Sequence, residues 1–493
     1  MSDLLLSAPI VLPIAGAAIS VVLGHSRRVQ RAVSIVVLVA LLAGNTTLAV
    51  LVDRDGIAAT QAGGWRAPLG ITLVVDRLAA IMLVIGTLVL LAVLVFAIGQ
   101  GGAERRHVGF HPIYLVLAAG VSATFVSGDL FNLFVAFEVM LTASYALLTL
   151  GGTREQVRSG MTYVVISLVA SSLFLTAVAF VYASTGTVNL ADLSEQLQVL
   201  PTGLRQALVL LLLGVFGIKA AVFPLYFWLP DSYPTAPTAV TAVFAGILTK
   251  VGVYAIVRTQ TLLLRPEDRF DTLLLVLAAI TMVVGVIGAI AQNDIKRILS
   301  FHIVSQIGYM LFGLALFTVA GVAGAIIYIV HHIVVKTTLF LIGGLIERRT
   351  GSGNLDRIGG LMRSSPLLGV LFLVTALSLA GLPPLSGFVA KFALVDAGLD
   401  AGAGIVVAVS LVVSALTLFS MTKIWTNAFG GEDPEAPTEQ PRRLPAGMVA
   451  PTIVLTVVSI AVAVGAGPLY GYTERAADEL LDPDRYRAEV LGP

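Results

Sequence analysis

The apolar stretch that decides the fold reads Gly214-Val-Phe-Gly-Ile-Lys219-Ala-Ala-Val-Phe-Pro224. It places a lysine and a helix-breaking proline inside a run that is otherwise hydrophobic enough to cross a membrane. Proline removes a backbone donor and leaves carbonyl groups free, which is tolerated at membrane depth where neighbouring protein or water satisfies them. A second stretch has the same character and reads Leu379-Ala-Gly-Leu-Pro383-Pro384-Leu-Ser-Gly387-Phe-Val-Ala-Lys391. Both stretches predict broken helices, which commonly mark binding sites in transporters.

The composition around these stretches indicates a membrane protein. Of the 493 residues, 57% are hydrophobic and only 12% are charged. Long apolar runs separated by short polar loops predict an all-α polytopic fold. The net charge of +1 gives no reason to expect nucleic acid as a partner, and the absence of cysteine excludes disulfides and thiolate metal sites. Because no phosphate loop, flavin or iron–sulfur motif is present, we expect no cofactor, no metal and no catalytic residues.

Hydropathy predicts about fourteen membrane-spanning helices. They cover roughly residues 4–23, 32–52, 78–98, 111–127, 130–150, 161–182, 204–227, 237–257, 272–291, 298–317, 320–345, 367–392, 402–429 and 447–468. The first is interpreted as a membrane helix and not as a removed signal peptide, because its N-terminus lacks a basic region.

The fourth to eighth and the ninth to thirteenth helices form two sets of five, and each set has its broken helix in fourth place. Because five is odd, consecutive copies would be inverted in the membrane. The chain would divide into three N-terminal helices at roughly 1–110, repeats at roughly 111–258 and 271–429, and a C-terminal part at roughly 430–493. The alternative is that the prolines are ordinary kinks, which are frequent in membrane helices.

Lysine and arginine are more frequent in the loops that follow the odd-numbered helices, which places those loops in the cytoplasm and both termini outside. The loop at 431–445 is then cytoplasmic, and the tail from Thr473 is an external surface segment. Lys423 is interpreted as an anchor at the cytoplasmic edge. Trp228 and Trp425, near the ends of spans, are interpreted as residues of the interfacial aromatic belt.

Four lysines and one glutamate lie within the apolar part of the chain: Lys219, Lys250, Lys336, Lys391 and Glu138. A charge at the bilayer centre costs about 2.5–3.5 kcal/mol on insertion scales. Several such residues in one chain indicate a route for ions, and protons are the natural cargo of Glu, His and Lys. The alternatives are a static ion pair between helices, lysines that extend to a membrane edge (Lys250 and Lys391), or a scaffold that moves no ions.

Histidines accompany these lysines. His332 and Lys336 are four residues apart and share a helix face, which suits a proton relay because histidine titrates near neutral pH. His331 points about 100° away around the same helix. A role for either histidine, or for His302, competes with ordinary packing or a hydrogen bond to a backbone carbonyl.

Two aspartates border predicted helices. Asp129 is expected to cap a helix, whereas capping and a site role are equally supported at Asp231.

Several longer motifs resemble one family, the antiporter-like subunits shared by respiratory complex I and Mrp cation/proton antiporters. They are Ser127-Gly-Asp-Leu-Phe-Asn-Leu-Phe-Val-Ala-Phe-Glu138, Lys219-Ala-Ala-Val-Phe-Pro-Leu-Tyr-Phe-Trp-Leu-Pro230-Asp231, Asp294-Ile-Lys-Arg-Ile-Leu-Ser-Phe-His302, His332-Ile-Val-Val-Lys336, and Gly381-Leu-Pro-Pro-Leu-Ser-Gly-Phe388 followed by Lys391. The resemblance covers nearly the whole chain, and its motifs occur in the family's order.

The resemblance implies that Glu138 pairs with Lys219, and that protons pass from this pair to Lys250, then to His332 and Lys336, then to Lys391. It also implies partner membrane subunits. Protons would be exchanged for a monovalent cation, and the existing proton gradient would drive the exchange. In length and tail the chain is similar to D-type Mrp subunits. A proton-pumping subunit of complex I or of a membrane-bound hydrogenase stays open as the alternative.

Overall fold

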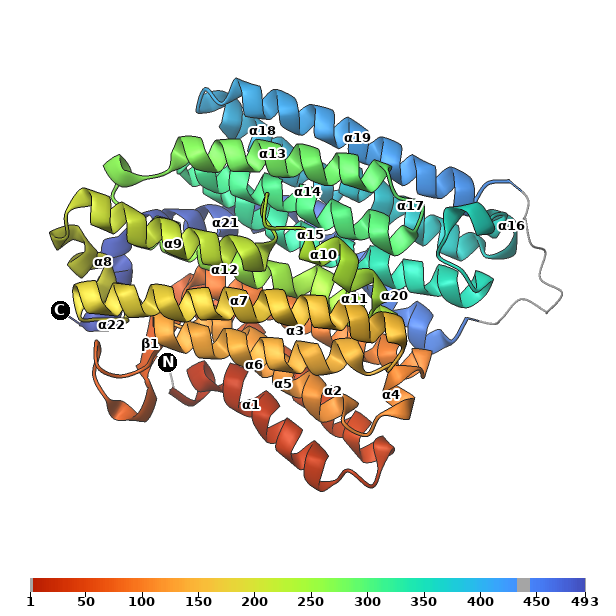
Figure 1. The fold of residues 1–493 in the computed structure, drawn as a ribbon, viewed down its shortest axis with the longest axis horizontal. Coiled ribbons are helices and arrows are strands. Elements are labelled where there is room, and N and C mark those ends of the chain that lie inside the picture. The colour runs from red at the N-terminus through yellow and green to blue at the C-terminus, as the bar shows by residue number, and fades with distance from the viewer. Residues whose placement is uncertain (1–2, 432–443, 493) are drawn as a thin grey trace.

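The structure is a computed structural model that describes residues 3–431 and 444–492. It is a bundle of long helices that run roughly side by side (Figure 1). Within the described residues, twelve helices are long and apolar enough to cross a membrane. Together with the shorter helix α5 (Phe110–Val126) and the broken pair α17 (Pro366–Ala380) and α18 (Ser386–Asp400), they correspond to the fourteen predicted spans. The predicted all-α polytopic fold is confirmed.

The N-terminal elements are α1 (Asp3–Val22), α2 (Arg27–Asp55), β1 (Ala58–Gln61), η1 (Ala62–Gly64), β2 (Thr72–Val75), α3 (Arg77–Gln100), α4 (Ala103–Arg106), α5, α6 (Leu130–Thr149), α7 (Arg154–Thr185), α8 (Leu190–Val199), α9 (Thr202–Ala220) and α10 (Trp228–Ser232). The central elements are η2 (Tyr233–Thr235), α11 (Thr238–Val243), η3 (Phe244–Leu248), α12 (Thr249–Leu262), η4 (Pro266–Asp268), α13 (Asp271–Ile290), α14 (Ile295–Ala315) and α15 (Val319–Thr350). The C-terminal elements are η5 (Leu355–Arg357), α16 (Leu361–Ser364), α17, α18, α19 (Gly404–Ala428), α20 (Ala446–Val464), α21 (Ala466–Leu481) and α22 (Pro483–Leu491).

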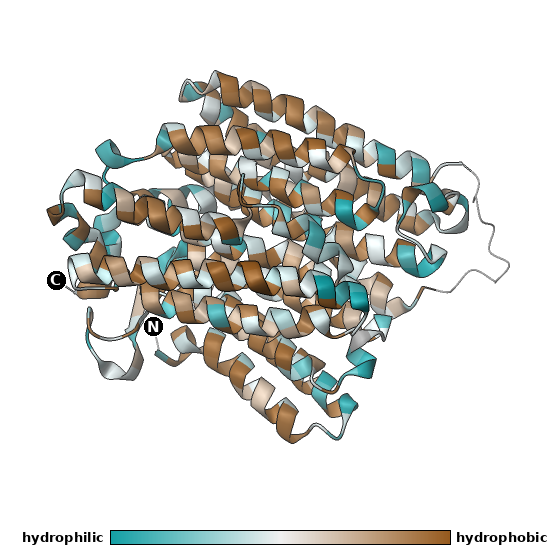
Figure 2. Ribbon diagram, viewed as in Figure 1, coloured by the Kyte–Doolittle hydropathy of each residue, from teal (hydrophilic) through white to brown (hydrophobic). Residues whose placement is uncertain are grey.

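Three spans form the interior of the bundle. The most apolar 18-residue windows of Thr238–Leu262 and of α15 are 100% buried, and that of α14 is 94% buried, whereas the window of α7 is only 39% buried. Hydrophobic residues cover the middle of the outer helices and hydrophilic residues gather at the two ends of the bundle (Figure 2). The outer helices therefore face lipid, and polar side chains on the inner three are shielded from it.

Both predicted helix breaks are present. Helix α9 ends at Ala220, and Ala221 takes a positive φ of 60° before the irregular segment that contains Pro224. Helix α17 ends at Ala380, and Gly381 takes a φ of 91° before Pro383 and Pro384. The seventh span was predicted over residues 204–227 with a break inside it, and its regular helix ends at Ala220 because Pro224 cannot donate the next backbone hydrogen bond.

One hydrogen-bonded junction occurs twice in the chain. Leu130 N donates to Val188 O, and Ile295 N donates to Gly353 O, at a constant spacing of 165 residues. The reciprocal bonds, from Leu190 N to Gly128 O and from Leu355 N to Asn293 O, keep the same spacing. Five spans separate the two junctions, so they lie on opposite sides of the bundle. This geometry supports the inverted repeat, while the boundaries of the four predicted segments stay a prediction.

The two chain ends lie at the same end of the bundle (Figure 1). The same end carries a two-stranded antiparallel hairpin in which β1 pairs with β2, from Ala58 with Val75 to Gln61 with Thr72. The sequence analysis predicted no strands, and this hairpin connects α2 to α3 outside the spans.

The C-terminal tail packs against the bundle, which corrects the prediction of a surface segment, while its predicted external side stays a prediction. Helix α21 packs against α15 and α3, and its residues Thr473 and Glu479 are buried. The Glu479 carboxylate accepts hydrogen bonds from the backbone N–H and the guanidinium of Arg77. The prediction was wrong because the charged residues of α21 mask a buried stripe of small and apolar side chains on its other face.

Asp129 caps a helix as predicted, whereas the predicted place of Lys423 at the cytoplasmic edge stays a prediction. Asp129 accepts a hydrogen bond of 2.7 Å from Asn132 N and caps α6. Lys423 donates to the Ile290 and Gln292 carbonyls, at 3.1 and 2.8 Å, and so caps the C-terminal end of α13. Most of the loop predicted to be cytoplasmic, residues 432–443, lies outside the described residues.

The docking of α21 should weaken as pH rises through about 7. Burial and the nearby Asp76 carboxylate raise the pKa of Glu479 from 4.5 to about 7, against the smaller opposing effects of Arg77 and Arg258. A raised pKa in the folded state stabilises docking below about pH 4.5, and this contribution is lost as pH rises through 7. A spin label on Glu474→Cys, in a chain without other cysteines, should become more mobile between pH 6 and 8. The same increase in spin-label mobility in a Glu479→Gln variant would show that ionisation of Glu479 is not its cause.

Candidate functional site

A serine connects Glu138 on α6 to Lys219 on α9. The Ser171 hydroxyl donates to the Glu138 carboxylate, and Lys219 Nζ donates to Ser171 Oγ at 3.4 Å and to the Ser167 carbonyl at 3.3 Å. Within the described residues, no ion pair shorter than 4.0 Å joins Glu138 to Lys219 directly. The expected pair is therefore bridged, because α7 packs against both α6 and α9 and its serine lies between the two charges.

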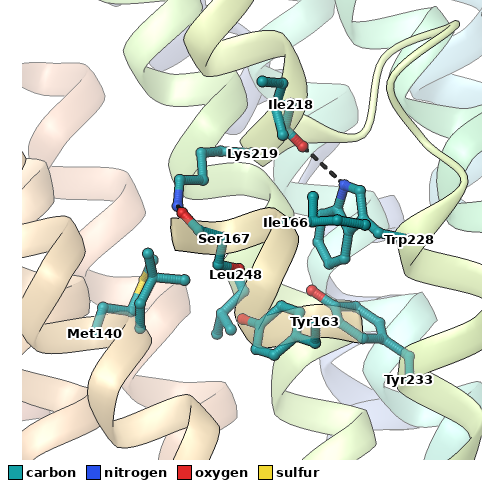
Figure 3. Close-up of a pocket in the computed structure, with 10 residues that line it drawn as sticks. Met140, Tyr163, Ile166, Ser167, Ile218, Lys219, Trp228, Tyr233 and Leu248 are labelled. Atoms are coloured by element: carbon teal, nitrogen blue, oxygen red, sulfur yellow. Dashed lines mark hydrogen bonds between the residues drawn. The ribbon is translucent and has the colours of Figure 1, made fainter. Parts of the chain in front are cut away.

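A small cavity lies beside Lys219 (Figure 3). Its volume is about 20 Å³, measured as space for the centre of a water-sized sphere, which is room for about one water. Tyr163, Trp228 and Tyr233 line it, and the Trp228 indole donates to the Ile218 carbonyl at 3.0 Å. Trp228 is only 6% exposed, so its predicted place in an interfacial belt is wrong. The break after α9 folds the chain back and carries this side chain inward.

Lys250 lies at the centre of the inner span Thr238–Leu262 and is fully buried. Its Nζ donates to the Ala245 carbonyl at 2.6 Å and to Thr249 Oγ1 at 3.1 Å. Ala245 belongs to the π-helical turn η3, which changes the regular helical hydrogen-bonding pattern next to the lysine. Lys250 therefore stays inside the bundle and does not extend to a membrane edge.

His332 and Lys336 lie on α15, and both are 0% exposed. Neither ring nitrogen of His332 has a hydrogen-bond partner within the described residues, and Lys336 Nζ has none there either. His332 is within electrostatic range of both Lys250 and Lys336, and the two lysines are within range of each other. The helix face predicted from the spacing thus lies near Lys250, and α15 packs against the turn η3 that precedes this lysine.

His302 on α14 continues this group. Its Nε2 is 3.0 Å from Ser420 Oγ, and the ring is within electrostatic range of both Lys336 and Lys391. Lys391, on α18, is 7% exposed and donates to the Ala380 carbonyl at 3.0 Å. This lysine lies at the helix break and does not extend to the interface.

His331 takes a different direction from His332, as predicted. Its Nδ1 is 2.8 Å from Ser386 Oγ, and Ser386 is 3.0 Å from Ser378 Oγ and 3.2 Å from Ser459 Oγ. Lys391 is also within electrostatic range of His331. His331 therefore belongs to a hydroxyl cluster at the second helix break.

A tight helix contact brings Lys219 close to the α12 backbone. A Cβ added at Gly252 would lie 2.6 Å from Ala220 N and 2.9 Å from the Lys219 carbonyl carbon. Only glycine permits this approach, which places the end of α9 against α12 two residues, or just over half a helical turn, from Lys250.

Asp231 is not part of this group. Its carboxylate pairs with Arg297 at 3.0 Å, and its side chain is 64% exposed. The broken-helix residues Pro224, Pro383 and Pro384 shape the backbone near Lys219 and Lys391 and contribute no titratable group.

Among the polar residues that contact the predicted ones, sequence reasoning missed Ser171, Ser386, Tyr309 and Tyr328. Helical spacing held a signal for two of them. Tyr328 lies one turn before His332, and Tyr309 lies two turns after His302. The two serines gave no such signal, because their partners lie on other helices.

Residues 127–417 match the model of the family described as NADH:quinone oxidoreductase/Mrp antiporter, TM. The chain belongs to this family. The D-type subunit of the Na⁺/H⁺ antiporter of Alkalihalophilus pseudofirmus is 45% identical over 486 residues, covering 98% of each chain. A chain in the Mrp complex of Dietzia sp. superposes with a TM-score of 0.93 at 34% identity, covering 100% of each chain. A chain of an archaeal membrane-bound sulfane sulfur reductase superposes with a TM-score of 0.90 at 25% identity, covering 99% of this chain and 100% of that one.

The family match contains every titratable residue described above, from Glu138 to Lys391. It excludes α1 to α5, α20 and the docked tail. The part that carries the residues of the candidate site is therefore the part that matches the family model.

Replacing Gly252 should separate α12 from the end of α9. In Gly252→Ala the methyl group would clash with backbone atoms, so we expect a loss of about 1–3 kcal/mol of stability, measured as a lower Tm of the purified protein. Gly214→Ala is the matched control, because its Cβ would have no neighbour within 4 Å. Equal Tm values for the two variants would contradict the close contact.

Proposed function

We propose that this chain is the proton-translocating, D-type subunit of a multisubunit monovalent-cation/proton antiporter. One observation carries the proposal: Lys250, His332 and Lys336 are completely buried within electrostatic range of one another. Two lysines and a histidine buried together without a carboxylate do not stabilise a static structure, because their charged forms repel one another. A site that passes a proton from one to the next uses this repulsion.

The relay begins at Glu138, Ser171 and Lys219. A carboxylate bridged to an ammonium through one hydroxyl stabilises the proton on the lysine. A small movement of α7 would lengthen the two hydrogen bonds of Ser171 and weaken this stabilisation. The proton on Lys219 would then pass towards Lys250, carried by a water in the adjacent cavity.

The central step depends on repulsion between like charges. A proton that reaches Lys250 makes a positive charge on Lys336 less favourable, since both lysines lie in a region of low dielectric constant. His332, in range of both lysines, can accept a proton on one ring nitrogen and release one from the other. The proton that leaves Lys336 would pass through His302 to Lys391 at the second helix break.

The monovalent cation would cross with, or through, partner membrane subunits of the same complex, driven by the existing proton gradient. We place the complex in the plasma membrane. Because lysine and arginine gather in the loops opposite the chain ends, both termini would face outside. In this proposal the chain is a transporter subunit without enzymatic activity of its own.

The resemblance to a subunit of an archaeal respiratory membrane complex favours a second candidate, a subunit that pumps protons at the expense of redox chemistry in its partners. The same proton relay is compatible with both the antiporter subunit and the redox-driven proton pump. The higher identity to the D-type subunit of a Na⁺/H⁺ antiporter, 45% against 25%, supports the first.

Lys250→Ala should abolish cation-dependent proton flux, because it removes the centre of the relay. We expect a decrease of about 10²-fold or more, the usual contribution of a positioned proton carrier. Fluorescence-monitored antiport in vesicles that contain the whole complex measures it, after normalisation to assembled complex. Lys423→Ala is the matched control, since Lys423 caps α13 outside the relay and its loss should leave the flux near the wild-type value. Retained antiport in Lys250→Ala would overturn the proposed relay, and coupling to a redox reaction would favour the second candidate.

Ser171→Ala should reduce the same flux by roughly 10- to 100-fold, since it removes hydrogen bonds to two charged groups. Ser172→Ala is the control, because the neighbouring Ser172 is exposed on the other face of α7. If both variants behaved like the wild type, Glu138 and Lys219 would not communicate through this serine.

A further inference from the structure

Lys391 is a buried lysine without an acidic partner. Its ammonium has one hydrogen bond, to the Ala380 carbonyl, and none of the ion pairs in the described part of the chain includes it. Lys219, by contrast, interacts with the Glu138 carboxylate through Ser171. The protonated form of Lys391 therefore needs another source of stabilisation, because an uncompensated buried ammonium is unfavourable.

The aromatic ring of Tyr309 supplies such a source. Lys391 Nζ lies 4.8 Å from the centroid of this ring, inside the range of a cation–π interaction. The interaction is strongest where water is excluded, and Tyr309 is 1% exposed while Lys391 is 7% exposed. The negative face of the ring is thus directed at the ammonium in an environment that strengthens the attraction.

Tyr309 cannot easily rotate away from this position. Its hydroxyl donates to the Ser410 carbonyl at 2.6 Å and lies 2.8 Å from Ser414 Oγ. The ring also stacks on Tyr328, with centroids 5.1 Å apart and planes inclined by 7°. Contacts from α15 and α19 therefore hold the ring in one orientation.

We propose that Tyr309 is a positioning residue that stabilises the protonated form of Lys391, in the place that Glu138 occupies for Lys219. The inference rests on the proposed relay and extends it to a residue that carries no charge. A ring and a carboxylate differ in one respect that suits the end of a relay: the ring cannot take the proton it stabilises. Lys391 can therefore only pass its proton onwards or return it towards His302.

Three substitutions of Tyr309 separate the ring from its hydroxyl. Tyr309→Phe keeps the ring and loses both hydroxyl contacts, so flux should stay within about threefold of the wild type. Tyr309→Leu and Tyr309→Met remove the ring, and flux per assembled complex should decrease about tenfold. The alkaline limb of the pH profile should move to lower pH by about one unit, because the proton on Lys391 is then held less tightly.

Two further variants make each outcome decisive. Tyr114→Leu removes another fully buried tyrosine, whose hydroxyl donates to the Leu90 carbonyl away from the relay, and its pH profile should match the wild type. Lys391→Ala tests the relay itself: wild-type flux in this variant would overturn the proposed function at this position. If Lys391→Ala is inactive while the Leu or Met variant keeps wild-type flux and pH profile, the relay stands and the role of Tyr309 is wrong. Loss of flux in Tyr309→Phe would overturn that role as well, even if the Leu and Met variants failed to assemble.

Discussion

An ammonium group inside a hydrocarbon layer is stable only if the protein replaces the water that the group has lost. Three of the four lysines of the proposed relay find a backbone carbonyl: Ser167 for Lys219, Ala245 for Lys250 and Ala380 for Lys391. The fourth, Lys336, has no hydrogen-bond partner among the described residues. The protonated form is therefore stabilised unequally among the four lysines. A proton moves between two of them only when the free energies of their protonated forms can be brought close to one another.

Irregular backbone lies beside two of these carbonyls, those of Ala245 and Ala380. In a regular helix each carbonyl already accepts one hydrogen bond from the amide four residues later, which leaves one lone pair for a side chain. The regular hydrogen-bonding pattern changes in the π-helical turn η3 and stops at the end of α17, and a lysine lies beside each of these places. Lipid would not tolerate such free groups, and the protein surrounds them with its own buried helices. The breaks, the burial and the lysines are thus parts of one arrangement.

The two halves of the bundle solve the same electrostatic problem with different chemistry. They share a hydrogen-bonded junction at a spacing of 165 residues (Leu130 and Val188, Ile295 and Gly353) and each contains a broken helix. In the first half a carboxylate reaches its lysine through a serine hydroxyl. In the second half a tyrosine ring faces the lysine directly. A carboxylate can be neutralised by the proton it attracts, whereas an aromatic ring cannot. Lys219 can therefore return its proton to its partner Glu138, but Lys391 cannot return its proton to Tyr309.

The sequence by itself determined the spans, both helix breaks and the identities of the buried charges, because hydropathy and proline act locally and a charge stands out within an apolar run. It also placed His332 and Lys336 on one face, since that spacing is fixed by helix geometry. Only the tertiary structure decided that Ser171 bridges Glu138 and Lys219, that Trp228 lines a cavity, that α21 docks, and that Tyr309 faces Lys391. Each of these contacts joins different helices, and which faces of two helices meet is fixed by packing, for which a single sequence holds no periodic signal.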